Sequence, residues 1–380
     1  MLQLLDIVGQ DAAVADLQRS LATARLPHAM MFVGPEGVGR RTTAAALAAS
    51  LLCERPDRTP NNGRLPQLPQ DFQLTQACGR CIDCKMMAAG THGDFQMVHK
   101  ELAKFHPDPA VRSRKMQELG IDVIRHFLIA PAGLSPTRGR GRVFVVRQAD
   151  LMSIVAQNAL LKTLEEPPDG TTIILICRRV DQMLPTTQSR CRPLHLGPLP
   201  RQFVVARLTE SGVEPGEAEF WAAFTNGSVG RAIALADGGM YQIKRDLLEH
   251  LGRLPADGDA ALGSRLAQIT ENLAKAAVKA SRNADGSEMA KTLATRQAAA
   301  VMLELIAGAF SDAVTLATGA QRPLIHTDQR PVVENLARRL VPGRLAAVIE
   351  QLSRYEQLLW RNVSPKIVWD NVALICATGR

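Results

Sequence analysis

A short apolar run, a glycine-rich turn and an alanine-rich helix, in that order, constrain this 380-residue chain more than any other feature. Ala29 to Val33 is typical of a strand. The turn Gly34-Pro-Glu-Gly37-Val-Gly39-Arg40-Arg41 follows it, and a helix is predicted from Arg41 to about Leu52. In this context, backbone N–H groups and a helix N-terminus can bind phosphate. The order therefore predicts one βα unit of a nucleotide-binding fold.

Two further strands are predicted at 142–146 and 171–177, separated by a helix from Ser153 to Glu166. Ser153 is a suitable N-cap, and Pro167-Pro168 ends the helix. Its predicted apolar face comprises Ile154, Val155, Leu160, Leu161 and Leu164. Alternation of strand, helix and strand predicts an α/β domain with a parallel sheet and crossover helices.

The pattern changes after Pro198-Leu199-Pro200, where strand signals fade. Short helices are predicted over 201–238, and long ones at 266–280, 289–318 and 345–360. We therefore expect an α/β domain at 1–197, a small helical part at 198–238 and an all-α domain at 239–380. Residues 54–77 are rich in Pro, Gln, Asn and Arg and predict an irregular insertion, and the basic residues 104–116 predict a loop.

Composition limits the class of protein. Hydrophobic residues make up 46% and charged residues 22%, which is typical of a globular chain. The net charge of +8 indicates either a solvated basic surface or contact with an anion such as nucleic acid. No uninterrupted apolar run reaches the roughly 18 residues that span a bilayer, and no signal peptide is recognisable. We expect a cytoplasmic protein with no membrane contact, whose cysteines stay reduced or bind metal.

Four cysteines form a candidate metal site. Cys78, Cys81 and Cys84 have the spacing C-x2-C-x2-C, and Cys53 lies upstream at the end of the first helix. Four thiolates suit tetrahedral zinc, and such a site leaves no position for water, so the metal would be structural. Cys53 is the least certain ligand, because residues 54–77 must loop out between it and Cys78. The other three cysteines, Cys177, Cys191 and Cys376, are expected to be buried as small apolar side chains.

The glycine loop lacks the residues that hydrolysis needs. Arg40 stands at the lysine position of G-x-x-x-x-G-K-[ST], Arg41 stands at the hydroxyl position, and Thr42 is one residue too far along. The strand ending at Val146 continues as Arg147-Gln148, where an ATPase carries acids that hold magnesium and orient water. Asp150 lies three residues beyond the position of the expected aspartate and is expected to be a cap or surface residue. ATP binding by Gly34, Gly37, Gly39, Arg40 and Thr42 is doubtful, so the loop either holds a phosphate passively or serves only the fold.

Several stretches together resemble the delta-prime family of bacterial clamp-loader subunits. They cover roughly residues 5–235, and the most specific are Asn158-Ala-Leu-Leu-Lys-Thr-Leu-Glu-Glu-Pro-Pro168 and Ser189-Arg190-Cys191. The others are Ile7-Val-Gly-Gln10, Leu26-Pro-His28-Ala29, the loop at 34–42, Cys78-Gly-Arg-Cys81-Ile-Asp-Cys84, Gly90-Thr-His92-Gly-Asp94 and Gly120-Ile-Asp122-Val-Ile-Arg125. Beyond residue 235 the resemblance rests on the helical pattern and on Asn362-Val-Ser-Pro365.

The resemblance implies a RecA-like AAA+ domain at 1–197 with a zinc module at about 53–90, a helical lid at 198–238 and a helical collar at 239–380. It implies a place in a five-subunit ring with tau/gamma and delta types, which loads the sliding clamp on primed DNA for the polymerase holoenzyme. Family members of this type often lack a working ATP site, so the chain itself is expected to catalyse nothing. The insertion between Cys53 and Cys78 is longer than is usual in the family.

Two arginines acquire roles from the same resemblance. Arg190 is similar to an arginine finger that enters the ATP site of a neighbouring subunit, where such a residue can raise the rate roughly 10³-fold or more. Arg231, in Gly227-Ser-Val-Gly-Arg231, is similar to a second sensor arginine and is equally open to a structural role.

Three other functions compete with this interpretation. An active motor subunit of the same loader should carry lysine, hydroxyl and acidic groups, and this chain has none of them at the expected positions. A free-standing zinc-dependent nucleic-acid-binding protein could use Arg138, Arg140 and Arg142 as a basic patch. An inert scaffold with a nucleotide-binding fold differs from the favoured interpretation only in lacking the arginine finger.

Overall fold

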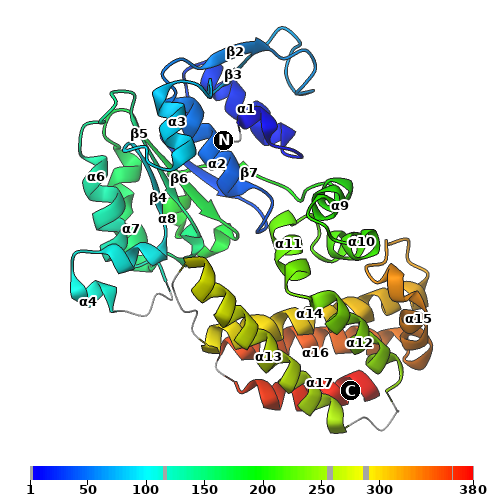
Figure 1. Cartoon of the computed structure of the whole chain (residues 1–380). Helices are drawn as coiled ribbons and strands as arrows, with labels where there is room; N and C mark the ends of the chain where they lie inside the picture. Colours follow the sequence, from blue (N-terminus) through cyan, green and yellow to red (C-terminus); the bar gives the residue numbers. More distant parts are fainter. Residues whose placement is uncertain (1–2, 114–117, 255–259, 286–290, 362, 380) are drawn as a thin grey trace. The chain divides into compact units, whose positions relative to one another are not determined.

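The computed structural model describes residues 3–113, 118–254, 260–285, 291–361 and 363–379 (Figure 1). The chain forms two compact units. The first comprises residues up to 204 together with 226–231, and the second comprises 205–225 and 232 onward. The chain therefore enters the second unit at residue 205, returns to the first for six residues, and leaves it again.

The first unit is built on a parallel sheet of order β4-β5-β6-β1-β7 (Figure 1). Its strands are β1 (Ala29–Val33), β4 (Phe95–Val98), β5 (Arg142–Val146), β6 (Thr171–Cys177) and β7 (Arg192–His195). In the pairing register, Phe144 lies opposite Ile173, and Met31 lies opposite Leu175. The central strands are buried on both faces, as runs of Val, Ile and Phe predict. The three predicted strands and the parallel sheet are confirmed.

The predicted helices at 41–52 and 153–166 are confirmed as α2 (Arg40–Leu52) and α7 (Ile154–Glu165). The Ser153 hydroxyl caps α7 by accepting the Ala156 N–H at 3.2 Å. Its predicted apolar face is wrong in the first turn, where Ile154 and Val155 are 65% and 59% exposed. The buried stripe runs through Ala156, Leu160 and Leu164, and Ile154 lies about 200° around the helix from Ala156.

Short elements connect β4 to β5. They are a 3-10 helix (Lys100–Phe105), α4 (Pro109–Arg112), α5 (Ile121–Ile124), a π-helical turn (Arg125–Ile129) and α6 (Ala130–Ala132). Residues 104–116 were expected to be loop, whereas α4 forms one helical turn that begins at the N-cap Asp108. Residues 114–116 of that prediction lie outside the described residues.

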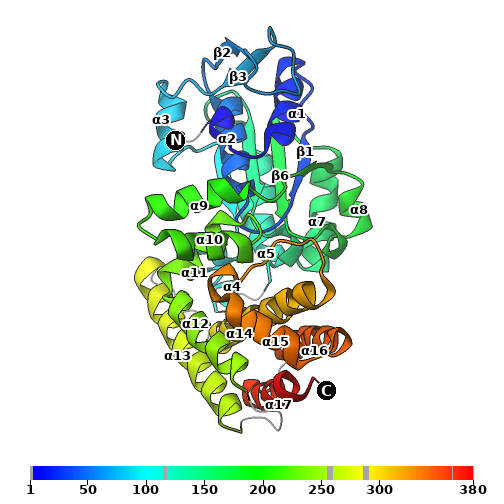
Figure 2. The same ribbon diagram turned by 90° about the vertical axis from the view of Figure 1, so that its right-hand side faces the viewer.

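The insertion at 54–77 is not irregular, which corrects the sequence prediction. It contains an antiparallel hairpin of β2 (Asp57–Pro60) and β3 (Gln73–Gln76), with Asp57 opposite Gln76. The hairpin lies beside α1 (Asp11–Ala22) in both views (Figures 1 and 2). Its apolar residues Leu65, Leu68 and Leu74 are buried in one cluster with residues 5, 14 and 15. Burial of these leucines against residues outside the insertion stabilises the polar-rich segment.

The second unit is helical. Its elements include α10 (Pro215–Phe224), α12 (Met240–Gly252), α13 (Ala260–Asp285), α14 (Lys291–Thr318), α15 (Arg330–Arg339), α16 (Pro342–Trp360) and α17 (Pro365–Thr378). Helices α9 (Arg201–Glu210) and α11 (Val229–Asp237) each span a boundary between the units. Helix α14 packs against α13, α15, α16 and α17. The helices predicted at 201–238, 266–280 and 345–360 are confirmed. The one at 289–318 is α14, whose first two predicted residues lie outside the described part.

Helix α14 qualifies the expectation about membranes. An 18-residue window within it has a mean hydropathy of 1.6 with at most two charged residues, so its length and composition match those of a membrane-spanning helix. Within the structure, 67% of that window is buried. A core helix of a bundle has the same composition, because it is surrounded by other helices rather than by water.

A buried polar network joins α10 and α12 to the turn before α15. Lys244 is fully buried, forms an ion pair with Asp328, and lies 4.0 Å from the centre of the Phe220 ring. The Tyr241 hydroxyl donates to the same carboxylate at 2.9 Å. A buried ammonium group is tolerated only when it is paired in this way. The network therefore fixes α10 to the rest of the second unit.

Candidate functional sites

The four predicted cysteines come together in the first unit. Cys53 is the C-cap of α2, and the other three lie on the turn before α3 (Ile82–Ala89) and on its first turn. All four sulfur atoms lie within 4.8 Å of one another, with Cys53 Sγ 3.9 Å from Cys81 Sγ and Cys78 Sγ 4.0 Å from Cys84 Sγ. A tetrahedral site with Zn–S bonds of about 2.3 Å needs sulfurs about 3.8 Å apart. The donor set and its spacing thus fit a structural zinc ion.

Backbone N–H groups lie close to three of these sulfurs. The N–H groups of Cys78, Cys81 and Cys84 approach the Sγ atoms of Cys53, Cys78 and Cys81 at 3.3, 3.4 and 3.4 Å. The Arg80 N–H, foremost, lowers the pKa of the Cys78 thiol to about 6. Burial instead raises the pKa of Cys53 and of Cys84. A divalent cation would reverse that rise, because it stabilises the deprotonated sulfur.

The hairpin explains how Cys53 reaches the other cysteines across a long insertion. Its two strands begin four residues after Cys53 and end two residues before Cys78, and their pairing brings both ends of the insertion together. The side-chain amide of Gln18 fixes the hairpin to α1. It accepts the Thr75 N–H at 2.7 Å and donates to the Thr75 carbonyl at 2.8 Å, as a neighbouring strand would. Asn61 closes the distal turn: its Nδ2, which carries two hydrogens, lies 2.9–3.1 Å from the carbonyl oxygens of residues 65, 68 and 69.

The turn before β5 is tied to the cysteine-bearing helix. Asp83, between two cysteines, accepts a hydrogen bond from Arg138 Nε at 2.8 Å and lies 3.4 Å from His92 Nε2. Asp94, fully buried, accepts the N–H groups of Thr137 and Arg138 at 2.8 Å each. Burial acts to raise the pKa of Asp94, but these N–H donors outweigh it and hold that pKa below its usual value.

The same contacts argue against a basic patch at 138–142. Arg138 pairs with Asp83, Arg140 donates to the Glu54 carbonyl, and Arg142 donates to the Ser135 carbonyl at 2.8 Å. Arg142 also lies 3.6 Å from Asp94. All three guanidinium groups therefore satisfy acceptors within the chain.

The glycine loop follows the carboxyl end of β1. At Gly34, a Cβ atom would lie 2.1 Å from the Leu196 carbonyl oxygen, and at Gly37 it would lie 2.3 Å from Ser228 Oγ. Gly37 and Gly39 have φ of +77° and +97°, which glycine adopts without strain. Gly39 is the N-cap of α2, and Thr42 lies in the first turn of that helix. The loop thus requires glycine at these positions, and residues 228–231 pack against Gly37.

Charged side chains gather beside this loop. Arg40 is only 8% exposed, and burial lowers the pKa of its guanidinium although Asp150 opposes that change. Asp150 Oδ2 lies 3.4 Å from Arg178 Nε, and Arg178 Nη1 lies 3.5 Å from Glu36. The carboxylate of Asp150 is 1% exposed, so its prediction as a cap or surface residue was wrong. It lies just beyond β5 and Arg178 just beyond β6, and carboxyl ends of parallel strands meet at one edge. Their positions after two predicted parallel strands were therefore the signal in the sequence that could have placed both residues at this site.

Arg190 lies in the turn between α8 (Pro185–Gln188) and β7. Its guanidinium forms an ion pair with Glu165, the last residue of α7, through Nε and Nη2. Nη1 donates to the Thr186 carbonyl at 2.7 Å and approaches Ser189 Oγ at 3.4 Å. Arg231 lies near the start of α11, with its N–H 3.3 Å from Ser228 Oγ. The two most specific sequence motifs, at 158–168 and 189–191, therefore meet at the Arg190–Glu165 pair.

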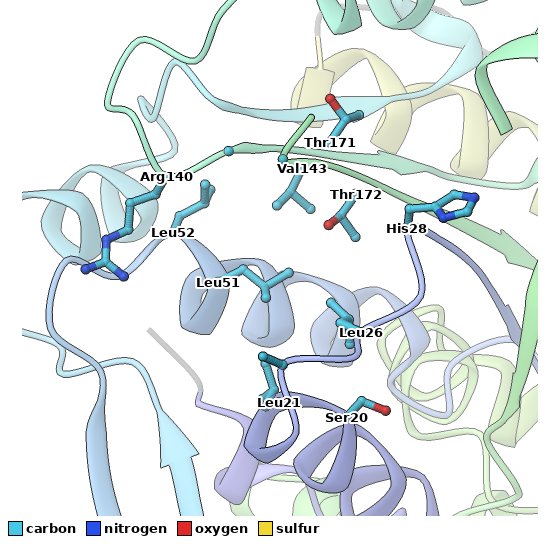
Figure 3. A pocket seen from close by; sticks show the side chains of 13 residues that line it. Ser20, Leu21, Leu26, His28, Leu51, Leu52, Arg140, Val143, Thr171 and Thr172 are labelled. Atoms are coloured by element: carbon cyan, nitrogen blue, oxygen red, sulfur yellow. The ribbon is translucent and has the colours of Figure 1, made fainter. Parts of the chain in front are cut away.

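A separate pocket of about 390 Å³ lies where β5 and β6 begin, at the edge of the sheet opposite to the glycine loop (Figure 3). Leu26, His28, Leu51 and Thr172 line it, and Arg140 stands at its rim.

Cys177 and Cys191 are fully or almost fully buried, as expected, and burial raises the pKa of these thiols to about 11 and 12. Cys376 is fully buried too, and burial also raises the pKa of its thiol to about 12.

Comparison with known protein families decides the identity. The family model described as "DNA polymerase III, delta subunit" matches residues 9–200, and a second model, for the C-terminal part of the delta subunit, matches residues 265–373. The chain belongs to the DNA polymerase III delta subunit family. The first match contains the cysteine cluster, the glycine loop and Arg190, whereas Arg231 lies between the two matches.

Curated relatives agree with this family. The delta' subunit of DNA polymerase III from Escherichia coli is 28% identical over 90% of this chain and 86% of its own length. The delta' subunit from Pseudomonas aeruginosa is 30% identical over 61% of this chain and 62% of its own. The tau subunit from Bacillus subtilis is 28% identical over 61% of this chain and 37% of its own.

Proposed function

We propose that this chain is a delta-prime-type clamp-loader subunit that does not hydrolyse ATP and that supplies Arg190 to the ATP site of a neighbouring subunit. The clamp-loader role follows from membership of the delta subunit family. The finer assembly is part of the proposal: a five-subunit ring with tau/gamma and delta subunits, acting in the cytoplasm on the sliding clamp and primed DNA.

The charges beside the glycine loop support the absence of hydrolysis. Where a motor subunit needs a magnesium-binding acid after its strand, β5 continues as Arg147-Gln148. The nearby acid, Asp150, is already paired with Arg178. Arg40 at the lysine position is buried and faces that same carboxylate. A magnesium ion at Asp150 would be repelled by the positive charges of Arg178 and Arg40, which weakens binding of the metal and of the nucleotide with it.

The cysteine cluster supports one structural zinc ion per chain. Cys53, Cys78, Cys81 and Cys84 would hold it, because their sulfurs already have near-tetrahedral spacing. When bound, the ion would join the C-terminal end of α2 to the turn before α3. The ionic contacts of Asp83 and Asp94 then connect this turn to the edge of the sheet.

The position of Arg190 at the end of a short helix, next to a family-specific motif, is the observation that carries the proposed role in trans. Its test is ring ATPase measured with subunits reconstituted around either the wild-type chain or Arg190→Ala. We expect the variant to enter the ring. At the ATP site of the subunit next to it, kcat should fall by about 10³-fold. An unchanged kcat in an intact ring refutes the assignment.

The contacts of Arg138, Arg140 and Arg142 do not favour a free-standing nucleic-acid-binding protein, since the arginines that would form its patch satisfy internal acceptors. Tight, salt-dependent binding of DNA by the isolated chain would instead support that function.

A further inference from the structure

We infer that Glu165 is a positioning residue that holds the Arg190 guanidinium in the orientation from which it reaches a neighbouring phosphoryl group. This inference rests on the proposed function of Arg190. Glu165 is the last residue of α7 and comes from the Asn158–Pro168 motif, while Arg190 belongs to the Ser-Arg-Cys motif 25 residues later.

The hydrogen-bond pattern shows how the arginine is held. A guanidinium carries five N–H donors in a fixed plane. The Glu165 carboxylate engages one edge of it, through Nε and Nη2. The Thr186 carbonyl accepts from Nη1 at 2.7 Å. These contacts hold all three guanidinium nitrogens, so they fix both the rotamer and the plane of the head group.

The remaining donors are available to a partner. Nη2 keeps a second hydrogen, and the second hydrogen of Nη1 meets only Ser189 Oγ, at 3.4 Å. The Arg190 side chain as a whole is 30% exposed, so the ion pair with Glu165 does not bury it completely. Two parallel N–H groups at the outer edge of an arginine match the geometry of two phosphoryl oxygens. Glu165 and Thr186 therefore hold the side chain, while the second hydrogen of Nη2 and the long Nη1 contact with Ser189 Oγ are left for a phosphoryl group to engage.

The backbone around the pair is also fixed. Glu165 follows the buried Leu164, and the Arg190 N–H donates to the Thr187 carbonyl at 3.3 Å. Thr187 and Cys191 are both buried, and helices α7 and α8 pack against each other. Because the backbone is fixed at both residues, the ion pair holds the Arg190 side chain, which has several rotatable bonds, in one orientation. Preorientation lowers the entropy cost of forming the transition-state contact.

The test uses the reconstituted ring, with Glu165→Gln in this chain and Glu166→Gln as the matched control. Glu166 is the next residue and is exposed, so its substitution removes the same charge one position away. We expect Glu165→Gln to lower kcat of ring ATPase about tenfold while KM for ATP changes less than about twofold. Glu165→Asp, which keeps the carboxylate, should recover part of the loss. Glu166→Gln should match the wild type.

A double variant separates positioning from a general loss of structure. If Glu165 acts through Arg190, adding Glu165→Gln to Arg190→Ala should lower kcat no further. Equal kcat for Glu165→Gln and Glu166→Gln, in a ring that Arg190→Ala does inactivate, overturns this inference and leaves the proposed function standing. An additive double variant also overturns it. If Arg190→Ala has no effect, the proposed function itself has failed.

Discussion

Replacing Gln18 with alanine should loosen the β2–β3 hairpin and the cysteine cluster that it closes. Gln18 is completely buried, and its amide makes two short hydrogen bonds, at 2.7 and 2.8 Å, to the backbone of Thr75. Alanine leaves one N–H and one carbonyl without partners, at about 1–3 kcal/mol each. After relaxation we expect the hairpin to lose about 2–4 kcal/mol of local stability.

Native-state hydrogen exchange measures that loss directly. A loss of 2–4 kcal/mol corresponds to exchange of the Thr75 amide about 30-fold faster or more, since each 1.4 kcal/mol is a factor of ten. Gln70→Ala is the control, because Gln70 is exposed on the same insertion. Gln18→Glu should also accelerate exchange, because a carboxylate can accept the Thr75 N–H but cannot donate to the carbonyl. Equal exchange rates at Thr75 in Gln18→Ala and in the wild type would refute the reasoning.

Three other outcomes follow from the contacts described above. Cys53→Ser should reduce bound zinc, measured by mass spectrometry of the metal, from about one ion per chain to well below half, while the remote Cys376→Ser retains it. Asp94 has a lowered pKa, so its charge stabilises the fold fully above about pH 5, and this contribution is lost as the pH falls through the lowered value. Asp94→Asn should therefore lower the free energy of unfolding by about 2 kcal/mol at pH 7. Measured by urea unfolding, the difference between the variant and the wild type should shrink below about pH 4. Lys244→Ala should destabilise the helical unit by about 3–5 kcal/mol in calorimetry, because Asp328 loses its partner; no shift in that unit's transition would contradict the buried-pair argument.

The sequence predicted the elements whose periodicity is imposed by burial. Strands β1, β5 and β6 are runs of apolar residues that a sheet covered on both faces requires, and their bounds were predicted to the residue. Helix α7 was predicted together with its Ser153 cap. Its apolar face was misassigned in the first turn, because an apolar residue near a helix end can fit the period and still lie outside the contact.

The hairpin at 54–77 was missed because its strands carry little local signal. Residues 57–60 are Asp-Arg-Thr-Pro, and polarity and proline both argue against a strand. What holds this hairpin is tertiary: three leucines against α1, and the amide of Gln18 from 57 residues earlier. Contacts of that range leave no pattern within a short window of sequence.

The candidate sites divide in the same way. The cysteine cluster was recognisable because three of its members lie close together in sequence, and the glycine loop because its turn requires positive φ. Asp150 and Arg178 were not recognised as a pair, since they lie on different strand ends and meet only through the order of the sheet. Glu165 and Arg190 were each part of a recognised motif, but nothing in either motif indicates that they touch.

Magnesium-dependent ATP turnover by the purified isolated chain tests the central claim most directly. With Asp150 paired to Arg178 and an arginine at the lysine position, the wild type should release no more phosphate than a protein-free blank, and no more than its own Asp150→Asn variant. Robust turnover by the wild type that Asp150→Asn abolishes would contradict the account, because it would show that this carboxylate holds a working magnesium ion.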